Sequence, residues 1–427
     1  MNGSQLNRRV TEPEFLPDVI DTSLDSEFHR ELRAFNQFGK QTQLLRTGGR
    51  QGGPPTYVNE FWTSRQRASN SLHEISYRAC FKAELVRFFV QRLSKESDWV
   101  YDPFAGRGTT ALETALLGRR VIANDINPLS RILTEPRLNA PSLTDVQERL
   151  SLIKVSRSAK AELDLSMFFH RKTEAEIVSL RNYLQQRLDS GKQDHIDQWI
   201  RMVATNRLTG HAPGFFSVYT FPPNQAVSAK AQSRINKIRR QRPEYRDTEA
   251  LIIRKTRALL RNLDAEARAN LGRANAKYHQ VDARNTIKIP DGTVQLTVTS
   301  PPFLDVVNYA EDNWLRCWFN GIDAGKVAAN ITMSRSVDQW SEVMRGVFVE
   351  LFRLTRRGGW IAFEVGEVRR GKIRLDEHVL PIGTSAGFLA EAILINSQKF
   401  TKTSHIWGID NNQRGTNTNR IVVFRKP

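Results

Sequence analysis

Residues 98–125 constrain the fold most, because a strand, a glycine-rich loop, a helix, a strand and an acid follow one another there. The apolar run Trp99-Val-Tyr101 leads into the loop Asp102-Pro-Phe-Ala-Gly-Arg-Gly108. Its two glycines let the backbone turn tightly and approach a ligand closely. Thr109 caps a predicted helix, and the next strand ends in Asp125, 23 residues after Asp102. This order is typical of βαβ units that bind a nucleotide ribose, so it predicts an α/β fold.

A rigid corner follows a second apolar run further along the chain. The sequence Thr299-Ser-Pro-Pro-Phe303 comes directly after Val294–Val298. Its two prolines fix φ and remove two backbone donors, so the corner presents carbonyls beside a hydroxyl and an aromatic ring. Such a corner can hold a flat ring that carries an amine, because the aromatic stacks and the oxygens accept hydrogen bonds. Taken alone, the same residues also fit an ordinary strand-to-loop turn.

Together the two motifs resemble those of the amino-methylating DNA methyltransferases. The segment 102–110 resembles the S-adenosyl-L-methionine loop of that family, and Ser-Pro-Pro-Phe at 300–303 resembles its catalytic motif in the form typical of cytosine-N4 enzymes. Adenine-N6 enzymes more often carry Asp or Asn where Ser300 stands. Residues 73–86 resemble the segment that precedes the cofactor loop, although the family usually has Pro at the position of Ala83.

The resemblance implies a Rossmann-like methyltransferase fold with a mostly parallel sheet, and S-adenosyl-L-methionine as cofactor. It implies that Asp102 lies near the amino-acid end of the cofactor, Asp125 at the ribose hydroxyls and Asp282 near the adenine amine. A strand-end cap is the alternative for Asp102, and a surface-turn acid is the alternative for Asp282. The other cofactor-binding residues that it implies are Tyr77, Phe81, Phe104, Gly106, Gly108 and Thr109, and the implied catalytic residues are Ser300, Pro301, Pro302 and Phe303.

Charge and cysteine content narrow the partners and the chemistry. Lys and Arg outnumber Asp and Glu by 63 to 45, and the formal net charge of +18 favours a polyanion, here double-stranded DNA. Neither of the two cysteines, Cys80 and Cys317, lies in a nucleophile motif, which argues against cytosine-C5 methylation. No His/Cys cluster has metal-ligand spacing, so no metal is expected. No apolar run spans a bilayer and no secretory signal opens the chain, so we expect a cytoplasmic protein of a bacterial or archaeal cell, without a membrane partner.

Composition divides the chain into four parts. Residues 1–58 are polar and include a Gly/Pro-rich stretch, so we expect a flexible N-terminal extension. Residues 59–141 carry the cofactor-binding half of the methyltransferase domain, and residues 277–427 carry its catalytic half. Between them, apolar residues three or four apart predict a largely helical insert at 142–276. The resemblance implies target recognition there.

Within the insert, a loop dense in aromatics at 210–223 precedes a basic helix. An aromatic loop beside such a helix could contact DNA, whereas a helix with a solvated charged face is the alternative. The cations that we expect at DNA are Arg234, Lys237, Arg239 and Arg240.

The resemblance implies direct methyl transfer to the exocyclic N4 amine of a cytosine extruded from DNA, within restriction–modification or phage defence. A cognate restriction endonuclease could accompany the protein. An adenine-N6 DNA enzyme, an RNA amino-methyltransferase and a catalytically idle DNA-binding subunit remain alternatives. The order of the motifs, with the cofactor loop before the catalytic corner, is the reverse of the more frequent cytosine-N4 order, and this leaves the subgroup open.

Overall fold

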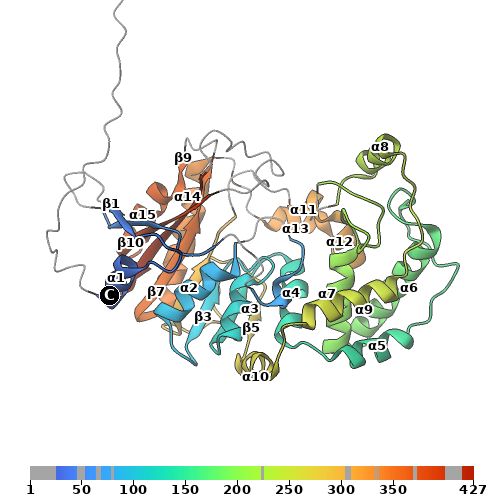
Figure 1. Cartoon of the computed structure of the whole chain (residues 1–427), viewed down its shortest axis with the longest axis horizontal. Coiled ribbons are helices and arrows are strands. Elements are labelled where there is room, and N and C mark those ends of the chain that lie inside the picture. The colour runs from blue at the N-terminus through green and yellow to red at the C-terminus, as the bar shows by residue number, and fades with distance from the viewer. Residues whose placement is uncertain are drawn as a thin grey trace, which may run out of the picture.

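The computed structural model describes residues 26–45, 53–63, 69–77, 81–222, 226–302, 309–331, 334, 336–368, 373–399 and 416–427. A nine-stranded sheet in the order β1-β2-β10-β11-β7-β6-β3-β4-β5 forms one side of the molecule (Figure 1). Its strands are β1 (Gln43–Leu45), β2 (Thr56–Asn59), β3 (Trp99–Asp102), β4 (Arg120–Asn124), β5 (Lys277–His279), β6 (Val294–Thr299), β7 (Thr355–Val365), β10 (Leu389–Lys399) and β11 (Thr416–Arg425). A small separate pair is made by β8 (Glu367–Val368) and β9 (Ile373–Arg374).

Strands β7, β6, β3, β4 and β5 pair in parallel, and β11 runs antiparallel to both of its neighbours. The predicted Rossmann-like sheet is therefore confirmed. Carboxyl ends of parallel strands meet at one sheet edge, and a ligand binds in the crevice outside those ends. The loops after β3, β4 and β6 thus share one edge.

Helices cover both faces of the sheet. On one face, α14 (Val337–Leu354) and α15 (Leu375–Ser385) pack on a core that includes Val422 and Phe424 of β11. On the other face, α1 (Glu27–Ala34) and α2 (Ala83–Leu93) pack on Ile421 and Val423 of the same strand. This alternation is the two-residue period of a strand that is buried on both faces.

The N-terminal region differs from the expectation of a flexible extension over 1–58. Ser26 caps α1, and Phe28 and Leu32 are buried in the core. Strand β2 pairs in parallel with β10, and its Tyr57 is fully buried. Apolar residues at the first, fifth and eighth positions of 28–35 place one helical face on the sheet, so residues 26–45 and 53–58 are structural. Residues 1–25 and 46–52 lie outside the described residues.

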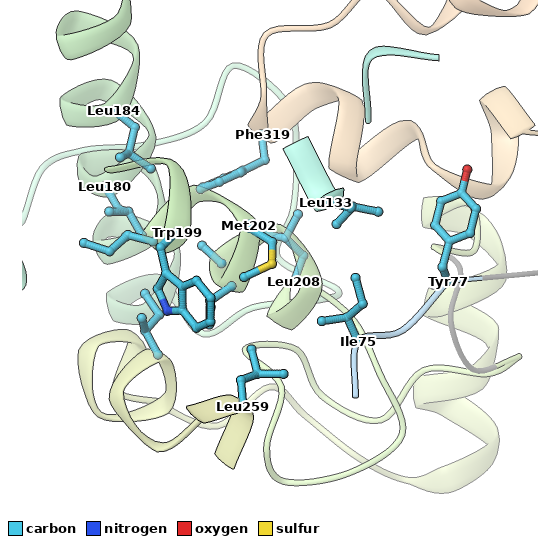
Figure 2. Packing of buried hydrophobic residues seen from close by; sticks show 14 of the residues in the cluster. Ile75, Tyr77, Leu133, Leu180, Leu184, Trp199, Met202, Leu208, Leu259 and Phe319 are labelled. Atoms are coloured by element: carbon cyan, nitrogen blue, oxygen red, sulfur yellow. The ribbon is translucent and has the colours of Figure 1, made fainter. Parts of the chain in front are cut away.

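Six helices occupy the predicted insert and lie beside the sheet (Figure 1). They are α5 (Leu143–Ser151), α6 (Arg171–Asp189), α7 (His195–Arg207), α8 (Ala229–Arg239), α9 (Thr248–Leu260) and α10 (Ala265–Arg273). The insert shares its core with the cofactor half: Trp199 and Leu208 belong to the same buried cluster as Ile75 and Leu133 (Figure 2). The remaining helices are η3 (Ser71–His73), α3 (Thr109–Leu116), α4 (Pro128–Leu138), α11 (Tyr309–Asp312), α12 (Trp314–Phe319) and α13 (Ala324–Asn330).

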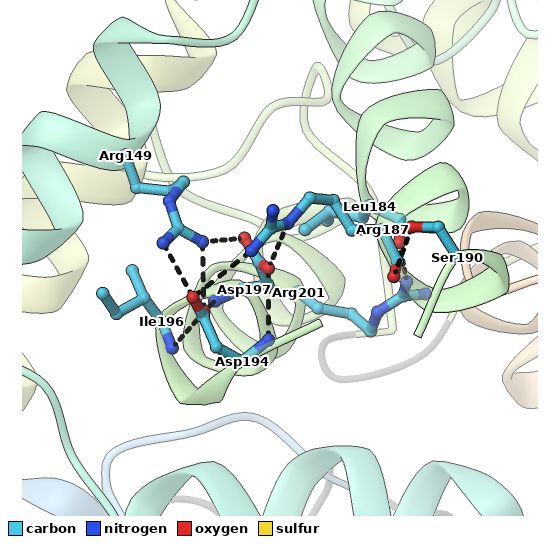
Figure 3. A network of polar contacts seen from close by, with 8 residues as sticks. All are labelled: Arg149, Leu184, Arg187, Ser190, Asp194, Ile196, Asp197 and Arg201. Carbon is cyan, nitrogen blue, oxygen red and sulfur yellow. Dashed lines mark hydrogen bonds and ion pairs between the residues drawn. The ribbon is translucent and has the colours of Figure 1, made fainter. Parts of the chain in front are cut away.

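A polar network fixes three insert helices to one another (Figure 3). The fully buried Asp197 of α7 accepts from Arg149 of α5 at 2.5 Å and from Arg187 of α6 at 2.7 Å. Asp194 caps α7 and pairs with both arginines. Removing one partner of a buried ion pair costs roughly 3–5 kcal/mol, because a buried charge is left uncompensated. The network therefore makes α5, α6 and α7 a rigid support.

Candidate functional site

The glycine loop after β3 adopts a backbone that its sequence requires. Gly106 has φ +52° and Gly108 has φ +73°, both in the left-handed region that favours glycine. A side chain at Gly108 would also collide with Thr134 of α4. The fully buried Arg137 of α4 donates to the carbonyl of Arg107 in the loop. The loop is thus held in one shape with its backbone exposed to the sheet edge.

Asp102, at the end of β3, is fully buried and only partly satisfied. Its Oδ1 accepts from Thr299 Oγ1 at 2.6 Å and from Phe104 N at 3.1 Å, whereas its Oδ2 has no hydrogen-bond partner among the described residues. Burial raises the pKa of Asp102 to about 7, against the opposing effect of these bonds. A buried carboxylate oxygen without a partner at a sheet edge fits a donor supplied by a ligand.

Asp125 lies where the sequence predicts it, after β4 and beside the glycine loop. Its carboxylate accepts from Gly106 N at 2.8 Å and from Asn127 N at 2.9 Å. Burial raises its pKa to about 6, although both hydrogen bonds lower it. Two backbone bonds leave lone pairs on this carboxylate for ligand hydroxyls.

Asp282 reaches the same edge by a different route. Asn124 of β4 donates to Val281 O at 3.0 Å and accepts from Val281 N at 3.1 Å, which fixes the segment that follows β5. The carboxylate of Asp282 already has a partner, because Arg284 Nη2 donates to it at 2.6 Å. This hydrogen bond lowers the pKa of Asp282. Asp282 is therefore near the predicted site with its charge balanced.

The remaining predicted cofactor residues fall into two groups. Tyr77 is buried beside the loop, where a Cβ on Gly106 would lie 3.7 Å from its Cε1. Thr109 is buried at the start of α3 and accepts from Arg107 Nε at 3.2 Å. The side chains of Phe81 and Phe104 instead pack on the two sheet cores, Phe81 on the α1/α2 side and Phe104 on the α14/α15 side.

The proline corner follows β6 and is joined to a carboxylate that the sequence reasoning missed. Ser300 follows Thr299, which pairs with Phe363 of β7, so it lies beside Glu364, whose side chain is 7% exposed. Burial raises the pKa of Glu364 to about 7, although Ser300 and the charge of Lys82 lower it. Pro302 O accepts from Trp340 Nε1 of α14 at 3.0 Å. An acid inside the apolar run Trp360-Ile-Ala-Phe-Glu-Val365 was the available signal. Phe303 lies outside the described residues.

One hydrogen bond joins the cofactor loop to the corner. Thr299 donates to Asp102 and directly precedes Ser300. Thr110 of α3 also donates to Val298 O at 3.0 Å. The arrangement can therefore hold a charged ligand at Asp102 beside the corner. There Ser300 can accept a hydrogen bond from a second bound molecule, and the Glu364 carboxylate can take a proton from it.

The predicted DNA contacts lie elsewhere. Arg234, Lys237, Arg239 and Arg240 are exposed at α8, and Figure 1 shows this helix at the end of the helical part, away from the sheet. The Arg239 guanidinium lies 3.9 Å over the Tyr219 ring, so the aromatic loop and the basic helix are neighbours. Beside them is a cavity of about 560 Å³ lined by groups that include His211, Tyr219, Arg240, Arg242 and Arg246.

The cysteine that the structure describes, Cys317, is buried in α12. Burial raises its pKa to about 11, so it is a thiol at neutral pH. Cys80 lies outside the described residues. In the ranges that the structure covers, no group of three or more His, Cys, Asp or Glu could hold a metal ion, and no helix is long and apolar enough to cross a membrane.

Known proteins resemble this chain in sequence and in fold. Residues 35–131 match the family described as DNA methylase. The chain is 20% identical to the type II methyltransferase M.BsoBI of Geobacillus stearothermophilus over 341 residues, 70% of this chain and 63% of that protein. It is 23% identical to the type II methyltransferase M.MvaI of Kocuria varians over 297 residues, 63% of this chain and 60% of that protein. Each match spans less than two thirds of the relative's length. A SAM-dependent methyltransferase structure from Methanosarcina mazei aligns with a TM-score of 0.32 at 8% identity, over 79% of this chain and 96% of that one.

Proposed function

Because the chain belongs to the family of amino-methylating DNA methyltransferases, we propose that it methylates the exocyclic N4 amine of a cytosine in double-stranded DNA, with S-adenosylmethionine as methyl donor. The observation that carries the base assignment is the Ser300-Pro-Pro302 corner, in which Ser300 lies beside the buried Glu364. A serine hydroxyl can accept a hydrogen bond from an amine, and the two prolines leave only carbonyls beside it.

The residues around the glycine loop fit S-adenosylmethionine. When bound, this cofactor supplies a methyl group that its sulfonium centre has already activated. Asp102 would bind the cofactor ammonium through its unpartnered Oδ2, and Asp125 would bind the ribose hydroxyls. Gly106 and Gly108 would let the backbone approach the ligand closely. Asp282 would accept a hydrogen bond from the adenine amine while it keeps the hydrogen bond from Arg284. Tyr77 and Thr109 would complete the proposed pocket, whereas Phe81 and Phe104 would support it from the two sheet cores.

At the reacting amine, Ser300 and Glu364 would act as a pair. The Ser300 hydroxyl would donate to the neighbouring Glu364, and its oxygen lone pairs would accept from N4–H. The carbonyl of Pro301 would accept the other N4–H, which holds the amine toward tetrahedral geometry and localises its lone pair. Once the amine has gained the methyl group its nitrogen must lose a proton, and the Glu364 carboxylate would take it. Phe303 would stack on the extruded base.

The insert would supply target recognition. The exposed cations of α8 and the ring of Tyr219 form a surface suited to a polyanion with flat bases. The proposed DNA-contacting residues are Arg234, Lys237, Arg239 and Arg240. Since two relatives are named type II methyltransferases, we place the activity in restriction–modification or phage defence, with a cognate endonuclease as a partner.

Nucleoside mass spectrometry tests the proposal. Duplex DNA is incubated with the protein and S-adenosylmethionine labelled at the methyl group, then digested to nucleosides. We expect label in N4-methylcytosine, and no label with the Ser300→Ala variant. Label in N6-methyladenine would overturn the base assignment and favour the adenine-N6 alternative. Label in 5-methylcytosine, or in RNA but not in DNA, would overturn the proposal as a whole.

A further inference from the structure

A group of cations gathers where the insert meets residues 74–77. Arg207 is the last residue of α7, and Arg254 and Lys255 lie on α9. The two guanidinium groups converge on one glycine, because a Cβ on Gly214 would lie 3.1 Å from Arg254 Nη2 and 3.9 Å from Arg207 Nη1. Lys255 Nζ donates to the carbonyl of Glu74 nearby. Three positive charges thus occupy one small region.

These charges have little compensation from the protein. Among the ion pairs of the described residues, none joins a carboxylate to Arg207, Arg254 or Lys255, and the carboxylate of Glu74 is paired with Arg261 at 2.8 Å. Burial and the charge of Arg207 lower the pKa of Lys255 to about 8, although Glu74 raises it. Burial, Arg316 and Arg254 lower the pKa of Arg207 to about 10. Like charges held together are destabilising, and such arrangements are characteristic of functional sites.

The cations are also fixed in place and reachable. The Arg207 guanidinium lies 4.0 Å over the Phe215 ring, and its Nη2 donates to Asn206 Oδ1 at 2.9 Å. Arg254 Nη2 donates to Pro213 O at 3.3 Å. Arg254 is exposed, and Arg207 and Lys255 are half-buried. Donors that are already oriented lose little conformational entropy when an anion binds.

The region is coupled to the cofactor loop through residues 73–77. Asn206 accepts from Ser76 N at 3.1 Å and donates to Ser76 O at 2.8 Å on the insert side. From the other side, Arg107 of the glycine loop donates to Ile75 O at 3.2 Å, and Tyr77 lies beside Gly106. In Figure 1, α7 and α9 lie close to α4, whereas α8 lies at the far end of the helical part. The cations are therefore nearer to the proposed active site than α8 is.

We propose that Arg207, Arg254 and Lys255 form a phosphate-binding site that holds the DNA backbone beside the active site. The inference rests on the proposed function for the identity of the polyanion. A DNA phosphate would supply the negative charge that the protein does not, and backbone contacts of this kind fix the register of a duplex without reading its sequence. The site is separate from the α8 surface, which would contact DNA further from the reacting base.

The test compares two double variants that remove the same number of charges. Arg254→Gln/Lys255→Gln removes two cations of the site, and Arg157→Gln/Lys160→Gln removes one exposed arginine and one exposed lysine after α5. Fluorescence anisotropy with a labelled duplex gives the slope of log K against log salt. We expect the slope of the site variant to fall by roughly 0.9 units, the value for one phosphate that is no longer neutralised, and that of the control to stay near wild type. Equal slopes in the two variants would overturn the inference.

Two further measurements keep the result interpretable. The single variant Arg254→Gln changes an exposed side chain, and we expect roughly half of the slope change from it. Neutralising a repulsive group should leave the melting temperature of the site variant at or above the wild-type value, and a purely structural role, with a lower melting temperature and an unchanged slope, would contradict the inference. If wild-type protein methylates DNA but the slopes do not differ, the phosphate site fails and the proposed function stands. If the slope falls as expected but no methylated nucleoside forms, the proposed function fails and the anion site stands.

Discussion

Replacing Glu364 with Gln should strongly lower turnover and, at high pH, stabilise the protein. Glutamine keeps the size of the side chain and an oxygen for Ser300, but it cannot take a proton from the amine. We expect kcat to fall roughly 10²–10⁴-fold, the usual contribution of a positioned acid or base. Cofactor affinity should not change, because Glu364 lies at the corner and the glycine loop is built on β3 and β4.

The stability effect follows from the raised pKa of Glu364. Burial raises this pKa from the ordinary 4.5 to about 7, so the folded protein holds the proton more tightly than the unfolded chain. The stabilisation that protonated Glu364 contributes is therefore fully present below pH 4.5 and is lost as the pH rises through 7. A rise of this size corresponds to a loss on the order of 3 kcal/mol. The glutamine variant does not lose this stability at high pH. For a chain of 427 residues, its melting temperature there should be about 3 °C higher than that of the wild type.

Thermal unfolding at about pH 4 and about pH 8.5 measures this difference. We expect the wild type and Glu364→Gln to melt together at the lower pH, and the variant to melt higher at the upper pH. The control is Glu350→Gln. Burial opposes ionisation of Glu350, but its bonds to Arg353 and Thr286 hold its pKa at about 2, so the same substitution should destabilise at both pH values. A Glu364→Gln variant that is active, or that melts lower at high pH, would refute the reasoning.

Three other predictions concern the cofactor loop, the corner and α8. Gly106→Val should block the approach of the cofactor, and Asp125→Ala should weaken cofactor binding in calorimetry by roughly 1.5–3 kcal/mol. The control Gly39→Val, at φ +76° with open space around it, should leave the cofactor affinity unchanged. Ser300→Ala should lower kcat and leave the cofactor Kd unchanged, whereas Cys317→Ser should retain turnover because its thiol is buried and protonated; a trapped thiol adduct would contradict this. Neutralising the α8 cations together should flatten the salt dependence of DNA binding by about 0.9 units for each phosphate that is no longer neutralised, and an unchanged slope would mean that the helix is only solvated. The substituted residues of that variant are Arg234, Lys237, Arg239 and Arg240.

The sequence predicted the parts of the site whose residues are adjacent in the chain. The glycine loop and the Ser-Pro-Pro corner each need special backbone geometry, and glycine and proline mark such geometry directly. The order of strands and helices around them then predicted the parallel sheet. The hydrogen bond that joins loop and corner links Asp102 to Thr299, which are 197 positions apart, and no local pattern encodes that contact.

The residues that were missed depend on neighbours in space. Glu364 matters because β7 lies beside β6, which brings its carboxylate to Ser300. Arg207 and Arg254 lie close together because α7 packs against α9, and both guanidinium groups lie near Gly214. The N-terminal error has another cause: the average polarity of residues 1–58 concealed the apolar face of α1, which a reading by helical period would have found.

If the insert recognises the target as proposed, the core that it shares with the cofactor half limits how recombination could exchange it. The insert begins at residue 142, after α4, and ends at residue 276, directly before β5, which pairs with β4. A foreign insert would, however, have to fit Ile75 and Leu133, which pack against Trp199 and Leu208. Helix α8 carries no such constraint, since Gln232 is its only buried residue. Under that proposal, α8 is the part of the insert that recombination could exchange most easily, whereas α5, α6, α7 and α9 contribute to the shared core.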